Sequence, residues 1–186
     1  MIAPTYACHG APLAAAASIR LLLLDVDGVL TDGRLYLGND GEEYKAFYTR
    51  DGLGLKMLQA TGVGVGIVTG RESDIVRHRA RDLGISFVIQ GCMDKRTAVI
   101  DLLATQQLPP AAAAFVGDDV IDLPAMNYVG LAIAVADAHP LVRARAHWTT
   151  GERGGRGAVR EVCELIMHAQ GTLTQQLEPR LHKETV

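Results

Sequence analysis

The sequence has few cysteines, few aromatic residues and no strong excess of charge. Its three cysteines, Cys8, Cys92 and Cys163, are widely spaced and form no CxxC pair, so neither a disulfide framework nor a cysteine zinc site is indicated. A formal net charge of −3 gives no electrostatic footprint for a nucleic acid or an anionic membrane. No stretch approaches the ~20 apolar residues of a membrane span. We therefore expect no nucleic-acid or membrane partner, and a reducing, cytoplasmic compartment.

The composition is that of one globular domain. A chain of 186 residues, 48% hydrophobic and 21% charged, can bury a sizeable core. Residues 1–18 contain an alanine run but no basic n-region, so we expect a disordered extension rather than a signal peptide. The folded domain should span residues 19–170. The tail 171–186 has no periodic apolar pattern, and we expect it to be flexible.

Strand and helix patterns alternate along this domain, which is typical of βαβ units with a parallel sheet. Short apolar runs predict strands near 20–25, 63–68, 86–89, 112–116, 130–134 and 147–149. Helical patterns lie near 51–60, 72–83, 94–106, 120–127 and 157–169. The predicted fold class is therefore α/β.

Residues 34–48 interrupt the alternation. Two apolar stretches flank the turn sequence Gly38-Asn39-Asp40-Gly41, which predicts a β-hairpin. Three of the five tyrosines fall in it, and on a monomer such a hairpin would expose a sticky patch. It either packs against neighbouring subunits or folds back onto its own domain.

Two aspartates, Asp25 and Asp27, follow the apolar run 19–24. The carboxyl end of a parallel strand is where open α/β sheets bind ligands. Two carboxylates so close would repel each other unless a cation shared the site, and hard oxygen ligands suit Mg²⁺. Taken alone, the pair could equally be an Asp-Gly turn with solvated acids.

Further polar motifs stand at later strand ends and helix starts, and they are Thr69-Gly70-Arg71, Asp94-Lys95 and Gly117-Asp118-Asp119. The order acid pair, threonine, lysine, acid pair resembles the four motifs of the haloacid dehalogenase superfamily of phosphatases. The resemblance runs from about Arg20 to Leu173. It implies a three-layer Rossmann-like fold, a central parallel sheet with helices on both faces, in which the hairpin is too small to be a cap domain.

Other segments narrow the resemblance. They are 25–33, 49–52, 117–122, 134–140 and 154–162. They resemble the 3-deoxy-D-manno-octulosonate 8-phosphate phosphatase family, whose sugar acid enters lipopolysaccharide. The family implies a homotetramer assembled through the hairpins, each active site partly closed by a neighbour. A related family acts on a nine-carbon sugar-acid 9-phosphate and has an acid at the position of Arg71, so Arg71 favours the eight-carbon substrate.

The resemblance implies roles for the acids. Asp25 is expected to be the nucleophile that forms an aspartyl-phosphate, and Asp27 the general acid and base. The carboxylates of Asp25 and Asp118 and the backbone carbonyl of Asp27 should bind Mg²⁺. Asp119 and Asp122 should hold metal waters or orient Lys95, although a helix N-cap explains either acid equally well.

The remaining candidates contact phosphate or sugar. Thr69 and the amides after it should hold the phosphoryl oxygens, and Lys95 should neutralise the nucleophile and the phosphate. The residues expected to bind substrate are Thr31, Gly70, Arg71, Arg79 and Arg156. Arg79 lies within the apolar stripe of helix 72–83, where an arginine either snorkels or pairs with an anion such as the sugar carboxylate. Arg156 lies in the glycine-rich segment 151–157, which is either a plain loop or a mobile anion-contacting segment.

Two other function classes remain. A receiver domain of two-component signalling also uses clustered acids, Mg²⁺, a threonine and a lysine, but it has no second acid pair after the lysine, as Asp118-Asp119 follows Lys95 here. A non-catalytic interaction protein would not be expected to keep this motif set. Release of phosphate from a simple ester with Mg²⁺ separates both from an enzyme.

Overall fold

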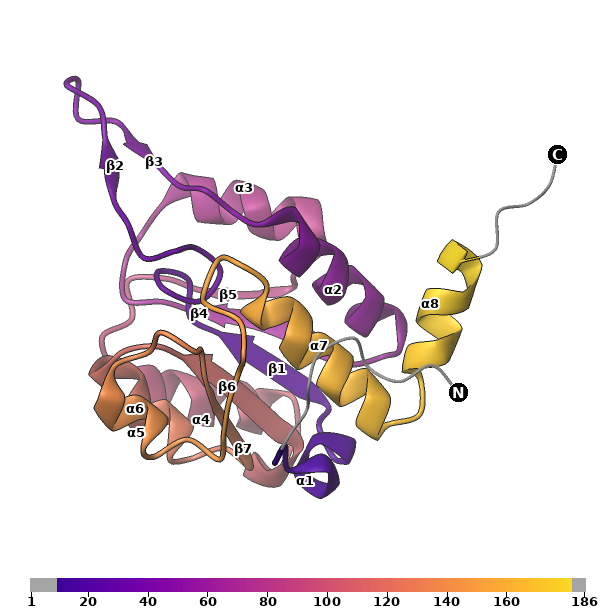
Figure 1. The fold of residues 1–186 in the computed structure, drawn as a ribbon. Helices are drawn as coiled ribbons and strands as arrows, with labels where there is room; N and C mark the ends of the chain where they lie inside the picture. Colours follow the sequence, from indigo (N-terminus) through magenta and orange to yellow (C-terminus); the bar gives the residue numbers. More distant parts are fainter. Residues whose placement is uncertain (1–9, 182–186) are drawn as a thin grey trace, which may run out of the picture.

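The computed structural model describes residues 10–181, which form a parallel sheet between two layers of helices (Figure 1). The sheet order is β5-β4-β1-β6-β7-β8, and every neighbouring pair is parallel. The strands are β1 Leu21–Leu24, β4 Gly64–Val68, β5 Phe87–Ile89, β6 Ala113–Gly117, β7 Leu131–Ala134 and β8 Trp148–Thr149. All six predicted strands are present, and the predicted α/β fold is confirmed.

Helices cover both faces of this sheet. One layer holds α2 Thr49–Ala60, α3 Asp74–Leu83 and α7 Ala158–Ala169; the other holds α4 Lys95–Thr105, α5 Leu123–Met126 and α6 Pro140–Arg143 (Figure 1). The central strands β1 and β6 are buried along their whole length, which explains their continuous apolar sequences. The chain moves outward from β1 to β5, returns to β6 and then moves outward on the other side. The order therefore reverses at β1, and the carboxyl ends of β1, β4 and β6 lie side by side.

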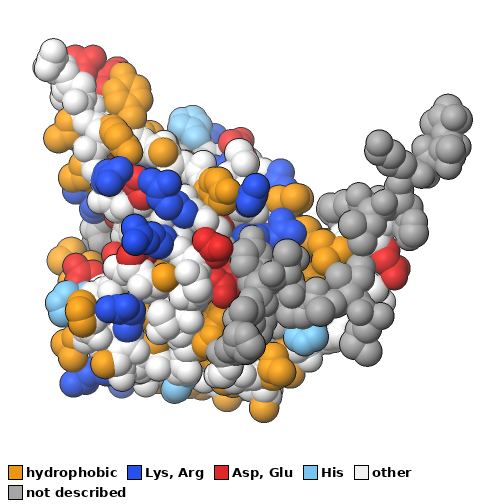
Figure 2. Space-filling view, viewed as in Figure 1, with side chains coloured by type: hydrophobic (Ala, Val, Ile, Leu, Met, Phe, Trp, Pro, Cys, Tyr) orange, Lys and Arg blue, Asp and Glu red, His pale blue; other side chains and the backbone are white. Residues whose placement is uncertain are grey.

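The hairpin projects from this domain. Its strands β2 Tyr36–Leu37 and β3 Glu43–Tyr44 pair antiparallel and extend away from the sheet (Figure 1). Leu37 is 68% exposed and Tyr44 is 56% exposed. Figure 2 shows hydrophobic side chains gathered on this projection. The distal part of the hairpin therefore does not fold back onto its own domain.

Both ends contain helices where we expected none. Helix α1 Leu13–Ala17 packs against α7, with Ala16 fully buried, because the alanine run is a strong helix former with an apolar face. Helix α8 Leu173–Leu181 follows α7, with Leu173 buried. The expectation of unstructured ends was wrong for these helices, and residues 1–9 and 182–186 lie outside the described part. None of the helices in residues 10–181 is long and apolar enough to cross a membrane.

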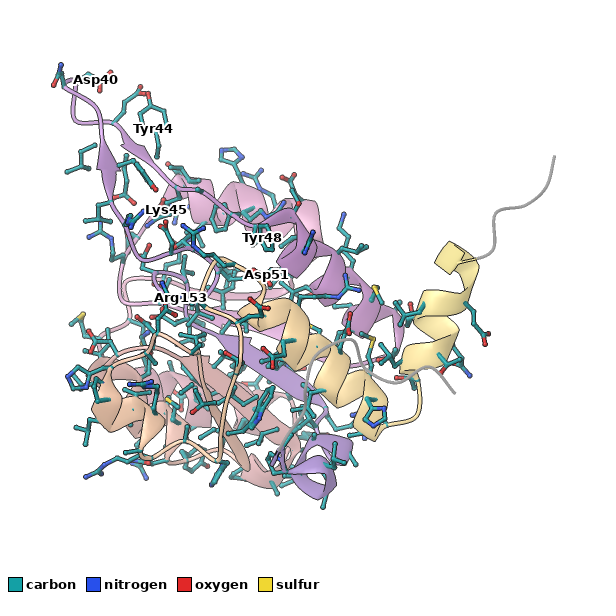
Figure 3. All side chains as sticks on the ribbon, viewed as in Figure 1. Asp40, Tyr44, Lys45, Tyr48, Asp51 and Arg153 are labelled. Carbon is teal, nitrogen blue, oxygen red and sulfur yellow. The ribbon has the colours of Figure 1, made fainter. Side chains whose placement is uncertain are left out.

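A buried aspartate joins helices α2 and α7. Asp51, in the first turn of α2, is 1% exposed, and its Oδ1 accepts a hydrogen bond from the backbone N–H of Arg160 at 2.8 Å (Figure 3). Burial raises the pKa of Asp51 to about 6, against the opposing effect of hydrogen bonds from the backbone of Arg160 and Gly157. Asp51 thus caps the amino end of α7, while its charged form is disfavoured.

Asp51→Asn should remove a pH-dependent loss of stability. Between pH ~4 and ~6 the folded wild type binds more protons here than the unfolded chain, so its free energy of unfolding falls as pH rises. The pKa change from 3.8 to about 6 is worth about 3 kcal/mol at ~1.36 kcal/mol per unit, and the helix dipole offsets up to ~1 kcal/mol of that. Urea unfolding from pH 4 to 8 should therefore show Asp51→Asn gaining about 2 kcal/mol over the wild type.

The matched control is Asp51→Ala, which lacks the acceptor for the Arg160 N–H and should be about 1 kcal/mol less stable than Asp51→Asn at every pH. Parallel stability curves for the wild type and Asp51→Asn would contradict the assignment.

Candidate active site

The carboxyl ends of the central strands surround a cavity of about 270 Å³. It is lined by Asp25, Asp27, Gly33, Thr69, Gly70, Arg71, Asp118, Asp119 and Ile121. Most of these residues come directly after β1, β4 and β6, so the strand order brings together motifs that are far apart in the sequence.

Asp25 lies at the base of this cavity. Its backbone N–H donates to the carbonyl of Val116 at 3.1 Å, which continues the β1–β6 ladder one residue beyond the strand. The residue is 5% exposed, and Lys95 Nζ lies 2.9 Å from its Oδ1. Burial and the charge of Asp122 raise the pKa of Asp25 to about 6, although Lys95 lowers it.

Lys95, in the first turn of α4, reaches the carboxylate of Asp25. Asp94 caps this helix, because its Oδ1 accepts from the Thr97 N–H at 3.1 Å. The Lys95 side chain is 1% exposed and lies 2.9 Å from Asp25 and 2.6 Å from Asp122. Burial alone would lower the pKa of Lys95, but the two carboxylates outweigh burial and raise it. The lysine therefore stays charged.

Asp122 organises the loop after β6. It is fully buried, and its Oδ1 accepts from Lys95. Its Oδ2 accepts from the backbone N–H groups of Asp118 and Asp119 at 3.0 and 3.3 Å. Both oxygens of Asp122 are thus occupied, and it orients Lys95 and the Asp118-Asp119 backbone together.

Asp118 is the acid with the least local compensation. Its Oδ1 is buried and has no hydrogen-bond partner among residues 10–181. Burial, followed by the charges of Asp122 and Asp25, raises the pKa of Asp118 to about 8. The backbone of Gly28 lies so close to this carboxylate that a Cβ there would overlap it, and its φ of +96° also favours glycine.

Three of these acids could hold a metal ion. Carboxylate oxygens of Asp25, Asp118 and Asp122 lie within 4.8 Å of one another. Because Asp122 already accepts three hydrogen bonds, Asp25 and Asp118 are the acids with free capacity. Hard, anionic oxygens fit Mg²⁺, and Asp25 and Asp118 are two of the three ligands expected from the sequence, the third being the backbone carbonyl of Asp27.

The loop after β4 forms the second wall. Thr69 is 2% exposed, and its Oγ1 accepts from the Arg71 N–H at 3.5 Å. The Arg71 side chain is half exposed and projects toward the base of the hairpin, where it lies 2.5 Å from Glu43 and 3.7 Å from Asp27. Arg71 therefore lines the cavity from the side of the hairpin.

Asp119 begins the short 3₁₀ helix Val120–Asp122, and its Oδ1 accepts from the Val120 N–H at 2.7 Å. It forms a reciprocal capping box with Asp122. Asp119 also lines the cavity, so the capping role and a position beside a bound ion are compatible.

The hairpin contributes two residues that the sequence reasoning missed. Lys45 Nζ lies 2.5 Å from Asp27 Oδ1 and 2.8 Å from Glu43 Oε1, with 1% of its side chain exposed (Figure 3). The hydrogen bond from Lys45, and next that from Arg71, lowers the pKa of Glu43. The alternation of Glu43 and Lys45 with the exposed Tyr44 could have indicated that both charges face one side.

Three predicted substrate residues, Thr31, Arg79 and Arg156, do not line this cavity. Thr31 is 1% exposed, and its hydroxyl donates to the carbonyl of Val26 and accepts from the N–H of Gly33, so it stabilises the turn after β1. Arg79 lies over the ring of Phe47 at 5.7 Å and lines a separate cavity beside α2. The buried apolar residues of α3, Val76, Ala80 and Leu83, belong to the main core.

Arg156 lies beside a different cavity, of about 250 Å³, at the base of the hairpin. Its guanidinium is 3.8 Å from Asp32, and its side chain is 60% exposed. The structure thus separates Arg156 from Asp25 within one chain.

The glycine-rich segment 151–157 crosses the turn after β1. Glu161 accepts from the N–H groups of Gly151 and Glu152, and the Gly155 N–H donates to the carbonyl of Val29 at 2.8 Å. A Cβ on Gly154 would overlap the carbonyl of Gly28. These contacts hold the segment against the turn after β1.

Known proteins share this arrangement. A sequence profile of haloacid dehalogenase-like hydrolases matches residues 85–161. The chain is 54% identical over 158 residues to the 3-deoxy-D-manno-octulosonate 8-phosphate phosphatase of Yersinia pestis, covering 85% of this chain and 84% of that protein. It is 52% identical over 163 residues to the enzyme of the same name in Escherichia coli K12, covering 88% and 87%.

Solved structures agree. The 3-deoxy-D-manno-octulosonate 8-phosphate phosphatase of Moraxella catarrhalis, solved with magnesium, phosphate and 3-deoxy-D-manno-octulosonate, superposes with a TM-score of 0.89 at 42% identity and covers 90% of this chain and 97% of that one. The Yersinia pestis structure superposes with a TM-score of 0.85 at 53% identity, covering 87% of each chain. The resemblance inferred from the motifs is confirmed. The chain belongs to the 3-deoxy-D-manno-octulosonate 8-phosphate phosphatase family of haloacid dehalogenase-like hydrolases.

Proposed function

We propose that this protein hydrolyses 3-deoxy-D-manno-octulosonate 8-phosphate to the free sugar acid and phosphate, with Mg²⁺, as a step of lipopolysaccharide biosynthesis in the cytoplasm. The observation that carries the proposal is that Asp25 and Asp118 line one cavity, with Lys95 paired to Asp25, in a chain whose relatives bear that activity in their names. Receiver and scaffold functions have no comparable support.

The first half of the reaction transfers the phosphoryl group to Asp25. A carboxylate oxygen of Asp25 forms a bond to phosphorus while the bond from phosphorus to the sugar oxygen breaks. The departing oxygen keeps that electron pair and takes the proton of the Asp27 carboxyl group. The sugar acid leaves as a neutral alcohol at this position, and Asp25 carries the phosphate.

The second half restores Asp25. The Asp27 carboxylate takes a proton from a water molecule, whose oxygen bonds to phosphorus as the bond to Asp25 breaks. Phosphate is released, and Asp27 is again protonated for the next substrate. Both carboxyl groups line the same cavity, as this exchange requires.

We propose that Mg²⁺ is held by the carboxylates of Asp25 and Asp118 and by the backbone carbonyl of Asp27. When bound, it supplies positive charge that offsets the repulsion between Asp25 and the phosphate dianion. Lys95 adds a second positive charge at 2.9 Å from Asp25. Asp122 keeps Lys95 in place, and Asp119 lies where it could bind metal waters.

Thr69 and Gly70 are proposed to bind the phosphoryl oxygens, and Arg71 the sugar acid. Arg71 has five N–H donors, only some of which reach Glu43, and it lines the cavity with half of its side chain exposed. Ile121 adds an apolar side chain to the lining of the same cavity. Arg71 is the cationic side chain placed to receive a carboxylate.

The assembly is proposed to be a homotetramer formed through the hairpins, each closing a neighbour's site. Leu35, Tyr36, Leu37 and Tyr44 are 43 to 68% exposed on a narrow projection, and such a concentration of apolar surface is typical of interfaces. Residues 19–170 are proposed to act as one catalytic domain, with α1 and α8 packed beside α7. Arg79 and Arg156 would then serve sites other than the cavity of their own chain.

Asp25→Asn should abolish phosphate release from 3-deoxy-D-manno-octulosonate 8-phosphate, because an amide is a poor nucleophile and a weaker metal ligand. The wild type should also lose its phosphatase activity in EDTA and regain it when Mg²⁺ is added. The matched control, Asp101→Asn on the exposed face of α4, should keep full activity. Substantial turnover by a folded Asp25→Asn variant, or activity in EDTA, would overturn the aspartyl-phosphate mechanism.

Placing charges on the hairpin should break the assembly. Leu37→Asp with Tyr44→Asp puts two carboxylates into the proposed contact, so light scattering should report species smaller than a tetramer, and kcat/KM for the sugar-acid phosphate should fall. Leu13→Asp, at an exposed leucine of α1 far from the hairpin, is the control. A charged double variant that stays tetrameric with unchanged kinetics refutes this assembly.

Arg71→Ala should weaken binding of the transition state of the sugar acid by ~1.5–3 kcal/mol, the scale of a lost charge-assisted hydrogen bond. This is about tenfold to a hundredfold in kcat/KM. The rate on 4-nitrophenyl phosphate, which has no carboxylate, should barely change. Arg77→Ala, exposed on α3, is the control, and wild-type activity on nine-carbon 9-phosphates tests the related substrate. Equal losses on both esters would place Arg71 at the phosphate.

A further inference from the structure

Lys45 is a buried lysine that the reaction described above does not use. It directly follows β3, yet only 1% of its side chain is exposed. Its ammonium lies 2.5 Å from Asp27 Oδ1 and 2.8 Å from Glu43 Oε1. A buried ammonium is tolerated only when it is paired, so the two carboxylates fix Lys45, and Lys45 in turn fixes them.

The contact with Lys45 is the shorter of two cationic contacts that the Asp27 carboxylate makes. In residues 10–178, the other charged group near its carboxylate is Arg71, whose Nε lies 3.7 Å from Oδ2. Asp122, by contrast, is oriented by three donors. Without Lys45, the Asp27 side chain would be free to rotate toward solvent.

The second partner of Lys45, Glu43, is itself held by another residue. Glu43 accepts from Arg71 at 2.5 Å, so the chain of charges runs from Asp27 through Lys45 and Glu43 to the loop after β4. Strand alternation directs Glu43 and Lys45 to one side and Tyr44 to the other. Figure 3 shows Lys45 at the base of the hairpin and Tyr44 nearer its tip.

We propose that Lys45 is a positioning residue that holds the Asp27 carboxyl group where it protonates the departing sugar oxygen. This inference rests on the acid role proposed for Asp27. Lys45 is not among the residues that line the cavity, so it acts through Asp27 rather than on the substrate. Misplacing a catalytic group by ~1 Å can cost about a hundredfold in rate.

Substrates with different leaving groups separate this role from a structural one. A sugar alkoxide departs only with a proton, whereas 4-nitrophenolate departs readily without one. The ratio kcat/KM includes steps only up to the first irreversible one, here transfer to Asp25, so the later role of Asp27 as a base does not enter. The slope of log kcat/KM against leaving-group pKa therefore measures proton donation.

The experiment compares Lys45→Met with the wild type on substituted phenyl phosphates and on 3-deoxy-D-manno-octulosonate 8-phosphate, with Mg²⁺ present. The variant should lose about tenfold to a hundredfold in kcat/KM on the sugar acid and less than about threefold on 4-nitrophenyl phosphate, since general acids contribute ~10²–10⁴-fold where a proton is needed. For Lys45→Met, the slope of log kcat/KM against leaving-group pKa should be steeper than for the wild type. Lys56→Met, at an exposed lysine of α2, should match the wild type.

Asp27→Asn completes a double-mutant cycle. It should steepen the slope by itself, and adding Lys45→Met should cost nothing further, because the two residues act as one unit. A steep Asp27→Asn slope beside an unchanged Lys45→Met slope would overturn the positioning role and leave the acid role standing. An unchanged Asp27→Asn slope would overturn the acid role and the inference with it.

An equal loss on all esters would reduce Lys45 to a structural residue and overturn the inference. If thermal unfolding shows that Lys45→Met does not fold, Lys45→Gln is measured in its place, with the same expected slope and the same contradicting result.

Discussion

The ammonium of Lys95, buried between Asp25 and Asp122, is the interaction on which the rest of the site depends. It lies within 3 Å of both carboxylates and is the positive charge that keeps two desolvated acids close together. The other oxygen of Asp122 accepts hydrogen bonds from the backbone N–H groups of Asp118 and Asp119. Through Asp25 and Asp122, Lys95 therefore connects the start of α4 with the ends of β1 and β6. Removing one partner of such a group leaves the others buried and uncompensated.

The site still carries more negative than positive charge. The pKa values of Asp25 and Asp118 are raised to about 6 and about 8, with burial as the largest cause in both. An arrangement that disfavours its own ionised carboxylates is poised to gain from a cation, since a divalent ion restores the charged forms that nucleophilic attack needs. The buried acids that lower the stability of the protein without a cation are thus the same acids that would bind one.

The sheet and the shared cavity could be predicted from the sequence because each strand end carried a local signal, and parallel strands deliver such ends to one edge. The sequence could not show where the side chains of Thr31 and Arg79 lie. The Thr31 hydroxyl is held by local hydrogen bonds within the turn after β1, and the Arg79 guanidinium lies over the ring of Phe47. Lys45 was missed because the hairpin suggested assembly only, and α1 because its alanines pack against a partner helix distant in the sequence.

The contact between Gly154 and Gly28 joins two parts of the chain that are made far apart in time during translation. Asp25 and its turn emerge early, but the segment that covers the turn, and the helix α7 that packs on α2, lie near the carboxyl end. Domains form as their parts become available during synthesis, amino end first. A nascent chain that stops short of α7 therefore has its catalytic acids without the backbone that shapes their turn, and the complete active site is a late product of translation.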